Sequence, residues 1–224
     1  MSMQALPPPK PGRRRLTLGA GALLSTLAWP ALASSRRSMV GMTDGPFYPA
    51  RAWREQWSDW DADLSRVQRD GRTLEARGEL LGLELKVQDI NGRRVDGAEV
   101  EIWQCDALAA YRHPRVRLVA GQYDPGFQGF GASRSDRDGQ LRFRSIRPVP
   151  YPGRTPHIHI KIRHASFGDV TSQLFIAGDP GNARDFLWRA VDEADRAMLE
   201  MQLQPAAADS GLRWQVRQAL VVPA

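Results

Sequence analysis

The strongest constraint on the fold of this chain is a series of short segments in which apolar and polar side chains alternate. The alternation runs through residues 83–88, 99–102 and 141–144. A period of two residues is typical of strands that bury one face. Dipeptides that favour tight turns separate or precede these segments: Asn91-Gly92, Asp96-Gly97 and Asp138-Gly139. The pattern therefore predicts a chain built mainly from strands.

The C-terminal half extends this pattern and adds one helix. Further strands are expected at 157–163, 170–176 and 212–221. In the segment 183–202, apolar residues instead recur every three or four residues after the turn Asp179-Pro180-Gly181-Asn182, which predicts a helix. No internal repeat or low-complexity linker divides residues 34–224. We therefore predict a single all-β domain, a β-sandwich with a helix on its C-terminal side.

Residues 1–33 have the composition of an export signal. Three arginines, 13–15, precede an apolar stretch from Leu16 to Ala33, and Ala31-Leu32-Ala33 supplies the small residues typical of a cleavage site. The alternative is an uncleaved membrane anchor, although about 18 residues interrupted by Pro30 are marginal against the roughly 20 that a spanning helix needs. The arginine pair resembles a twin-arginine signal. We expect a bacterial periplasmic or secreted protein with no stable membrane anchor after cleavage.

Charge and cysteine content exclude two classes of function. The formal charge of +6 includes four basic residues from the leader, and without them 27 basic residues face 25 acidic ones. No later run of Lys and Arg carries interleaved aromatic residues, so a nucleic-acid partner is not expected. The single cysteine, Cys105, excludes an intrachain disulfide and a cysteine-rich zinc or iron–sulfur site.

The stretch His157-Ile158-His159-Ile160 is the most informative for function. Alternate side chains of a strand share one face, so the isoleucines are expected in the core while both histidines project on the other side. Their Cα atoms would lie roughly 6.5–7 Å apart, which allows two imidazoles to bind one metal ion. The alternative is a strand that carries two histidines by chance, and the pattern alone leaves it open.

A site with two histidines needs further ligands, and tyrosine offers them. Tyr151 lies six residues before His157 in the proline-rich loop 147–156, which is stiff enough to direct a phenol toward the strand. A phenol with a pKa near 10 ionises at neutral pH only beside a strongly Lewis-acidic ion. Two anionic oxygens beside two imidazoles favour Fe(III) over Zn(II). For a single tyrosine, a packed ring with a hydrated hydroxyl is the alternative.

Several separate motifs follow one another between residues 43 and 182. In chain order they are Gly45-Pro46-Phe47-Tyr48, Val100-Glu101-Ile102-Trp103-Gln104-Cys105-Asp106-Ala107, Tyr111-Arg112-His113-Pro114, Ser135-Asp136-Arg137-Asp138-Gly139, Pro150-Tyr151-Pro152, Arg154 to His159, and Gln173 with Gly178-Asp179-Pro180. Their order and spacing resemble those of the intradiol ring-cleavage dioxygenases, non-haem iron enzymes related to protocatechuate 3,4-dioxygenase. The resemblance is to a compact, exported member of that family.

The resemblance implies an Fe(III) centre and assigns its ligands. The four protein ligands would be Tyr111, Tyr151, His157 and His159. Arg154 matches the active-site arginine of the family and Gln173 matches a glutamine behind the ligands. Arg154, Gln173 and Tyr111 are thereby expected to be catalytic, Tyr111 as the ligand that the substrate displaces.

The chain departs from the family pattern at two places. Ala109 stands where the family usually has a glycine, two residues before the first ligand tyrosine. Only five residues separate Tyr151 from His157, without the longer insertion of many members. His113 and His164 fall on no matched ligand position and are expected to be surface or hydrogen-bonding residues. Three tryptophans with helical spacing are expected to pack: Trp53, Trp57 and Trp60.

The resemblance implies cleavage of a catechol between its two hydroxylated carbons, with O2 as the second substrate and a muconate-type diacid as product. A homo-oligomer is compatible with the sequence. Two other hypotheses stay open: a non-catalytic, prealbumin-like β-sandwich that binds a ligand, and a His-x-His zinc or copper enzyme. The sequence does not specify which catechol is used.

Overall fold

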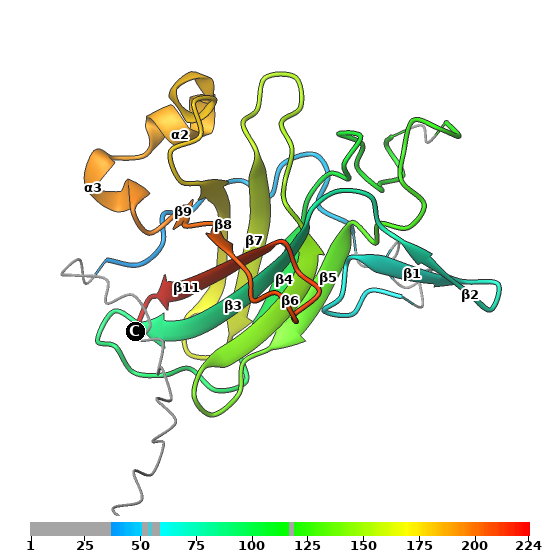
Figure 1. The fold of residues 1–224 in the computed structure, drawn as a ribbon. Coiled ribbons are helices and arrows are strands. Elements are labelled where there is room, and N and C mark those ends of the chain that lie inside the picture. Colours follow the sequence, from blue (N-terminus) through cyan, green and yellow to red (C-terminus); the bar gives the residue numbers. More distant parts are fainter. Residues whose placement is uncertain (1–36, 51–53, 55–58, 117–118) are drawn as a thin grey trace, which may run out of the picture.

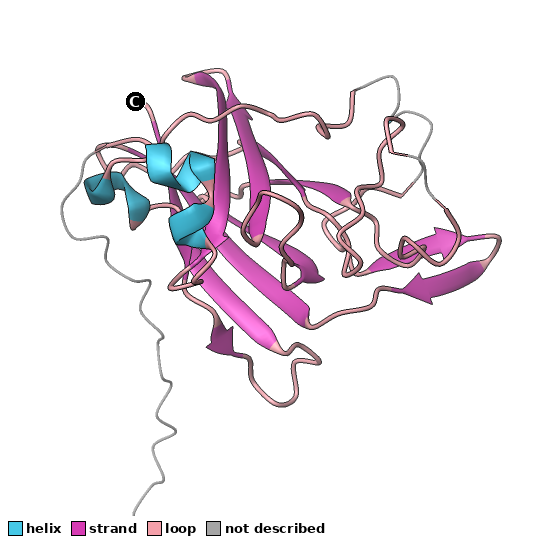
Figure 2. Cartoon of the chain, turned by 90° about the horizontal axis from the view of Figure 1, so that it is seen from above, coloured by secondary structure: helices cyan, strands magenta, loops and turns pink. Residues whose placement is uncertain are grey.

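A computed structural model of the protein describes residues 37–50, 54, 59–116 and 119–224. The predicted export signal at 1–33 and two of the tryptophans expected to pack, Trp53 and Trp57, lie outside these residues. Across the described ranges, none of the helices is long and apolar enough to cross a membrane. Strands dominate the structure, and its short helices are grouped at one edge (Figures 1 and 2).

Two β-sheets pack against each other as a sandwich, as predicted. One sheet has the strand order β10–β11–β3–β6, and the other has the order β5–β4–β7–β8–β9. The strands of the first sheet are β3 (Leu80–Asp89), β6 (Gln140–Ile146), β10 (Gln204–Pro205) and β11 (Trp214–Val222). The strands of the second sheet are β4 (Glu99–Trp103), β5 (Phe130–Arg134), β7 (His157–His164), β8 (Gly168–Ile176) and β9 (Glu200–Met201). A separate hairpin, β1 (Arg66–Arg69) and β2 (Arg72–Glu75), projects to one side (Figure 1).

The core lies between the inner faces of the two sheets. Leu83, Leu85 and Val87 of β3 are buried, as the alternation predicts. From the opposite sheet, Ile158 and Ile160 of β7 are fully buried in the same cluster. At about 25 cal/mol per Å² of apolar surface, burial of this kind is the main contribution to stability. Two of the predicted turns contain glycines at φ values that favour glycine, Gly92 at +80° and Gly139 at +73°.

A helical segment lies on the C-terminal side of the sandwich, as predicted, but it is not the single helix expected at 183–202. Instead the chain forms a 3-10 turn η1 (Asn182–Arg184), two short helices α2 (Phe186–Ala190) and α3 (Glu193–Arg196), and β9. Val191 ends α2 in an extended conformation with φ −83° and ψ 131°, and its buried side chain turns into the core. The next residues pair with β8, where the Phe175 amide donates to the Leu199 carbonyl at 2.8 Å. Tertiary packing thus breaks up the apolar periodicity that suggested one helix.

The outer face of the five-stranded sheet carries the polar residues of β7. His157 and His159 project there, and the same alternation continues to Lys161 and Arg163. Antiparallel register places Trp103 of β4 opposite His159. On the other side of β7, His159 is also paired with Gln173 of β8. Both histidines are nevertheless buried, because loops cover this end of the sheet.

Candidate metal centre

Four rings that the sequence singled out meet at one end of β7. His157 and His159 come from the strand, Tyr151 from the loop before it, and Tyr111 from the loop after β4. Ring centroids are 4.8 Å apart for the two histidines and 5.5 Å apart for Tyr151 and His157. They are 5.6 Å apart for the two tyrosines and 6.2 Å apart for Tyr111 and His159. Each ring therefore contacts two others, and the four rings of Tyr111, Tyr151, His157 and His159 form a closed cycle, which we call the ring cycle.

The nitrogen atoms of the histidines face each other across this cycle. His157 Nδ1 lies 2.7 Å from the Thr155 carbonyl oxygen, which only accepts hydrogen bonds, so Nδ1 carries the proton. The lone pair of His157 then lies on Nε2, which is 3.2 Å from His159 Nε2. Metal–imidazole bonds are about 2.0–2.1 Å long, so one ion between these atoms is within bonding reach of both.

Burial keeps both imidazoles neutral, as a metal ligand must be. Burial and, to a smaller extent, the positive charge of Arg154 lower the pKa of His157 to about 4. Burial also lowers the pKa of His159 well below its ordinary value, and His157 and Arg154 add to the effect. Neutral imidazoles bind cations through a ring nitrogen, whereas protonated ones do not.

The two phenols supply the remaining donors. Tyr111 is 4% exposed, and its Oη has no hydrogen-bond partner among the described residues. Burial raises the pKa of Tyr111 well above its ordinary range, and the neighbouring Tyr151 raises it further. A buried hydroxyl without a partner costs free energy, which coordination of a cation would offset. The donor set of two imidazoles and two phenols therefore fits a hard trivalent ion such as Fe(III).

In the described part of the chain, no group of three or more His, Cys, Asp or Glu side chains is arranged to hold a metal ion. The donors that surround the histidine pair are thus the two phenols rather than further imidazoles or carboxylates. His113 and His164 lie elsewhere and form hydrogen bonds, as expected: His113 Nδ1 accepts from the Arg115 amide at 3.1 Å, and His164 Nδ1 lies 2.9 Å from the Ser166 hydroxyl. Cys105 is buried beside Tyr111 in an aromatic cluster.

Arg154 reaches the ring cycle from the same loop as Tyr151. Its Nη1 lies 3.5 Å from Tyr151 Oη, and its Nη2 donates to Gln173 Oε1 at 2.5 Å. Gln173 is fully buried on β8. Arg154 Nε donates to Asp185 Oδ2 at 2.8 Å, in an ion pair that is largely buried. Asp185 and Gln173 therefore fix the guanidinium of Arg154, and its Nη1 lies against the hydroxyl of Tyr151.

Asp185 is a positioning residue that sequence reasoning missed. Its Oδ1 accepts hydrogen bonds from the Leu187 and Trp188 amides and so caps α2. Its Oδ2 binds Arg154 and also accepts from the Thr155 amide at 3.0 Å. The sequence signal was present, because an aspartate is a favoured residue before the first turn of a helix. Because one long helix is predicted from residue 183, Asp185 is placed inside that helix and its role as a cap is not recognised.

Trp103 and Tyr48 support His159 from the other side. The Trp103 ring stacks on His159 with centroids 4.8 Å apart and planes 9° apart. Tyr48 packs against Trp103 at 4.9 Å with an edge-to-face geometry. Burial and the hydrogen bond to Glu101 together raise the pKa of Tyr48 to about 12. The Tyr48 hydroxyl is thus a fixed donor that joins the aromatic stack to a charged network.

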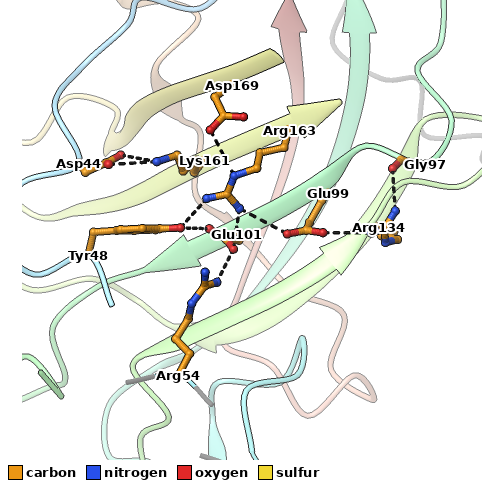
Figure 3. A network of polar contacts seen from close by, with 10 residues as sticks. All are labelled: Asp44, Tyr48, Arg54, Gly97, Glu99, Glu101, Arg134, Lys161, Arg163 and Asp169. Atoms are coloured by element: carbon orange, nitrogen blue, oxygen red, sulfur yellow. Dashed lines mark hydrogen bonds and ion pairs between the residues drawn. The ribbon is translucent and has the colours of Figure 1, made fainter. Parts of the chain in front are cut away.

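Figure 3 shows this network around Glu101, which is fully buried on β4. Glu101 Oε2 accepts from Tyr48 Oη at 2.7 Å, and Oε1 forms ion pairs with Arg54 and with Arg163, the latter at 2.8 Å. Burial by itself raises the pKa of Glu101, but the hydrogen bonds from Arg163, Tyr48 and Arg54 outweigh it and lower the pKa. The carboxylate therefore stays charged and ties Tyr48 and Arg54 to the sheet beside the ring cycle.

The loop that carries Tyr111 contains a strained residue. Ala109 has φ +63°, in the left-handed region where glycine is favoured. Asp106 stabilises the turn, because its Oδ1 accepts from the Leu108 and Ala110 amides at 2.8 and 2.9 Å. Ala109 is the position at which the sequence departs from the resembled family, and this backbone conformation gives a physical reason for a glycine there.

Comparison with known proteins places the chain among dioxygenases. A family model described as dioxygenase matches residues 44–218, a range that includes all four rings and Arg154. The protocatechuate 3,4-dioxygenase beta chain of Burkholderia cepacia is 34% identical over 148 residues, which are 62% of this chain and 61% of that one. Catechol 1,2-dioxygenase 2 of Acinetobacter lwoffii is 28% identical over 181 residues, 73% of this chain and 60% of that one. The chain thus spans about three fifths of the length of these relatives.

A solved structure shares the fold. The dioxygenase domain of a dioxygenase carbohydrate-binding protein fusion from Streptomyces sp. SirexAA-E superimposes with a TM-score of 0.61. The likeness covers 84% of this chain and 99% of that domain at 23% identity. The sandwich and the helical segment beside it are therefore a recurring architecture.

The strain at Ala109 predicts a stabilising substitution. Ala109→Gly should raise the free energy of unfolding by about 1 kcal/mol, because an alanine in the left-handed region costs about 1–2 kcal/mol, part of which the entropy of glycine offsets. Urea unfolding measures the change. The matched control is Ala110→Gly, at a position with ordinary backbone, which should lower the free energy of unfolding. Equal losses in both variants would contradict the prediction.

The buried charge of Glu101 predicts a pH-dependent stability. Its pKa is lower in the folded state, so its contribution is present above the ordinary glutamate pKa of about 4.3 and is lost as the pH falls through the folded value. Glu101→Gln should lower the free energy of unfolding by about 3 kcal/mol at pH 7. The difference in the free energy of unfolding between Glu101→Gln and the wild type should become smaller toward pH 3.

Urea unfolding between pH 7 and pH 3 checks this, with Glu99→Gln as the control. Glu99 lies two residues away on the same strand face but is 36% exposed in its side chain, so its replacement should change stability by less than about 1 kcal/mol. A Glu101→Gln variant that loses stability in parallel with the wild type over the whole range would refute the role assigned to this carboxylate.

Proposed function

Because the chain belongs to the intradiol ring-cleavage dioxygenase family, we propose that it is a non-haem Fe(III) enzyme that opens a catechol ring between its two hydroxylated carbons. The co-substrate would be O2, both atoms of which enter the product, a muconate-type diacid. The observation that carries the proposal is the cycle of Tyr111, Tyr151, His157 and His159, in which two phenol rings and two imidazole rings lie against one another at one end of β7.

Residues Tyr151, His157 and His159 would hold the iron, and Tyr111 would be the fourth ligand. A ferric ion bound there would supply the Lewis acidity that ionises the phenols and the hydroxyls of a bound catechol. The Thr155 carbonyl keeps His157 Nδ1 protonated and directs Nε2 toward the centre. The Trp103 ring holds the plane of His159. These contacts fix the ligands before substrate arrives.

Tyr111 is suited to leave the centre when substrate binds. It comes from a loop rather than from a strand, and it stacks on Phe47 with ring centroids 4.4 Å apart. In the proposed reaction, Tyr111 would leave as a phenolate that takes one catechol proton on its Oη, and a hydroxide in the site would take the second proton. The departing Tyr111 is then a neutral phenol, and the negative charge stays on the doubly deprotonated substrate.

Arg154 would stabilise negative charge on the substrate ring during cleavage. The guanidinium is already oriented by Asp185 and Gln173, so no reorganisation is needed when charge develops. A preorganised donor of this kind contributes about 3 kcal/mol to stabilisation of a transition state. Gln173 has a supporting role in this proposal, because it acts on the reaction through Arg154.

Location and assembly belong to the same proposal. The arginine-rich leader at 1–33 supports export, and with it a bacterial periplasmic or secreted enzyme. The proposal also includes assembly as a homo-oligomer. Neither the alternative of a passive binding domain nor that of a zinc or copper enzyme explains why two phenols close the cycle around the histidines.

Iron content and colour test the ligand set. Phenolate bound to Fe(III) produces a visible charge-transfer band, so iron-loaded protein should be coloured. Tyr151→Phe should shift or bleach the band, and His157→Ala should release iron, because a lost ligand weakens metal binding. Tyr123→Phe is the control, since Tyr123 lies outside the ring cycle, and it should leave both readouts unchanged. A colourless protein that contains stoichiometric iron would contradict the ligand assignment.

Oxygen uptake with a panel of catechols tests the reaction. Product analysis should show cleavage between the hydroxylated carbons and not beside them. Arg154→Gln should lower kcat by roughly 100-fold, because it removes a charge-stabilising donor, while iron content is retained. Equal turnover by wild type and variant would exclude Arg154 from the reaction, and the absence of turnover with every catechol by coloured, iron-loaded protein would exclude the proposed activity.

A further inference from the structure

A cleft of about 510 Å³ lies next to the candidate metal centre. One side is the loop 147–156, and the other is the segment 179–185 that leads into α2. Figure 1 shows these segments rising beside each other at the same end of the sandwich. The tyrosine and histidine rings do not line the cleft, but Arg154 lines it and also contacts Tyr151 and Gln173. The arginine therefore connects the cleft with the ring cycle.

The walls of the cleft combine rigid apolar surface with positive charge. Four of its lining residues are prolines: Pro148, Pro150, Pro156 and Pro180. Three are arginines: Arg147, Arg154 and Arg184. Proline rings present fixed apolar faces, which suit a flat or aliphatic group without ordering flexible side chains. Guanidinium groups suit carboxylates, which they bind through parallel hydrogen bonds.

The two acidic residues of the cleft accept hydrogen bonds from groups within it, and Asp185 is also ion-paired with Arg154. Both carboxylate oxygens of Asp185 accept hydrogen bonds, from Arg154 and from backbone amides. Asp179 Oδ1 accepts from the Gly181 amide at 2.8 Å and from the Thr155 hydroxyl at 3.3 Å. In contrast, Arg184 is exposed and forms no ion pair with any described residue. The cleft thus has a cation without an acidic partner at its rim.

We propose that this cleft binds an acidic side chain of the catechol substrate, and that Arg184 selects for its negative charge. The inference rests on the proposed function and narrows its substrate class to catechols that carry a carboxylate on an alkyl spacer. The dihydroxylated end lies at the ring cycle, the spacer contacts the proline walls, and the carboxylate reaches Arg184. Arg154 lines the cleft and contacts Tyr151, so the cleft and the ring cycle adjoin at this residue.

The short loop between Tyr151 and His157 is consistent with this arrangement. Tyr151 and Arg154 close a tight turn, in which the Arg154 amide donates to the Tyr151 carbonyl at 2.9 Å. Gly153 in this turn has φ +82° and no heavy atom within 4 Å of where a Cβ would lie. The turn therefore leaves open space at the mouth of the cleft, where a longer insertion would occupy it.

A matched pair of ligands and a matched pair of variants test the proposal. The ligands are 3-(3,4-dihydroxyphenyl)propionate and 4-ethylcatechol, which share the catechol ring and differ in the terminal carboxylate. The variants are Arg184→Ala and Arg189→Ala. Arg189 is also exposed, belongs to α2 and does not line the cleft. Dissociation constants are measured by calorimetry on iron-loaded protein without oxygen, and kcat/KM is measured in air.

Arg184→Ala should raise the dissociation constant of the propionate by roughly fivefold to tenfold, since one charge-assisted contact at a partly exposed site is lost. Arg184→Ala should leave the dissociation constant of 4-ethylcatechol unchanged. Arg189→Ala should leave the dissociation constants of both ligands unchanged. Arg184→Glu should weaken binding of the propionate further and leave binding of the neutral 4-ethylcatechol unchanged. In air, kcat/KM for the two substrates should follow the same pattern.

Two results would overturn the inference. One is that Arg184→Ala changes the dissociation constants of both ligands by the same factor. The other is that Arg184→Ala and Arg189→Ala change the dissociation constant of the propionate by the same factor. Failure of the proposed function has a different signature, because 4-ethylcatechol would then not be cleaved by the wild type at all. In that case the anaerobic dissociation constants still decide whether the cleft recognises the carboxylate.

Discussion

His157 Nε2 and His159 Nε2 lie 3.2 Å apart inside a nearly dry interior, and the surroundings of the site are arranged around this contact. The two-residue period of β7 sends both rings to one face, while the isoleucines between them anchor the strand in the core. Lone pairs brought together in this way are unfavourable unless a proton or a cation lies between them. The two phenols complete a set of donors that one cation would satisfy together.

The structure holds this costly arrangement in place from three sides. The antiparallel register with β4 sets Trp103 against His159. The cap of α2, Asp185, fixes Arg154 on the opposite side of the cycle. The charged network at Glu101 ties the segment with Tyr48 to the sheet. Each support joins two segments that are distant from each other in sequence, so the site is preorganised by the whole sandwich.

Short-range patterns predicted the strands and the shared face of the two histidines. They also supplied the motifs that carry the resemblance, from Tyr111 to His159. They failed at 183–202, where buried contacts of Val191 and strand pairing at Leu199 override a helical period. They also gave no sign that Glu101 is buried, because that depends on Arg54 and Arg163 approaching from distant segments. Pairings between remote segments are set by tertiary structure and leave no local period to detect.

The parallel pairing of β11 with β3 has a consequence for the biogenesis of the protein. Arg217 of β11 binds Glu84 of β3 across 133 positions of sequence, and the nine residues of β11 each pair with β3. On the ribosome, β3 emerges early and lacks this neighbour until translation has passed residue 222. Contacts that close such long loops form slowly. Until residues 214–222 have been synthesised, β3 therefore keeps an open hydrogen-bonding edge, which leaves the nascent chain exposed to pairing with other strands.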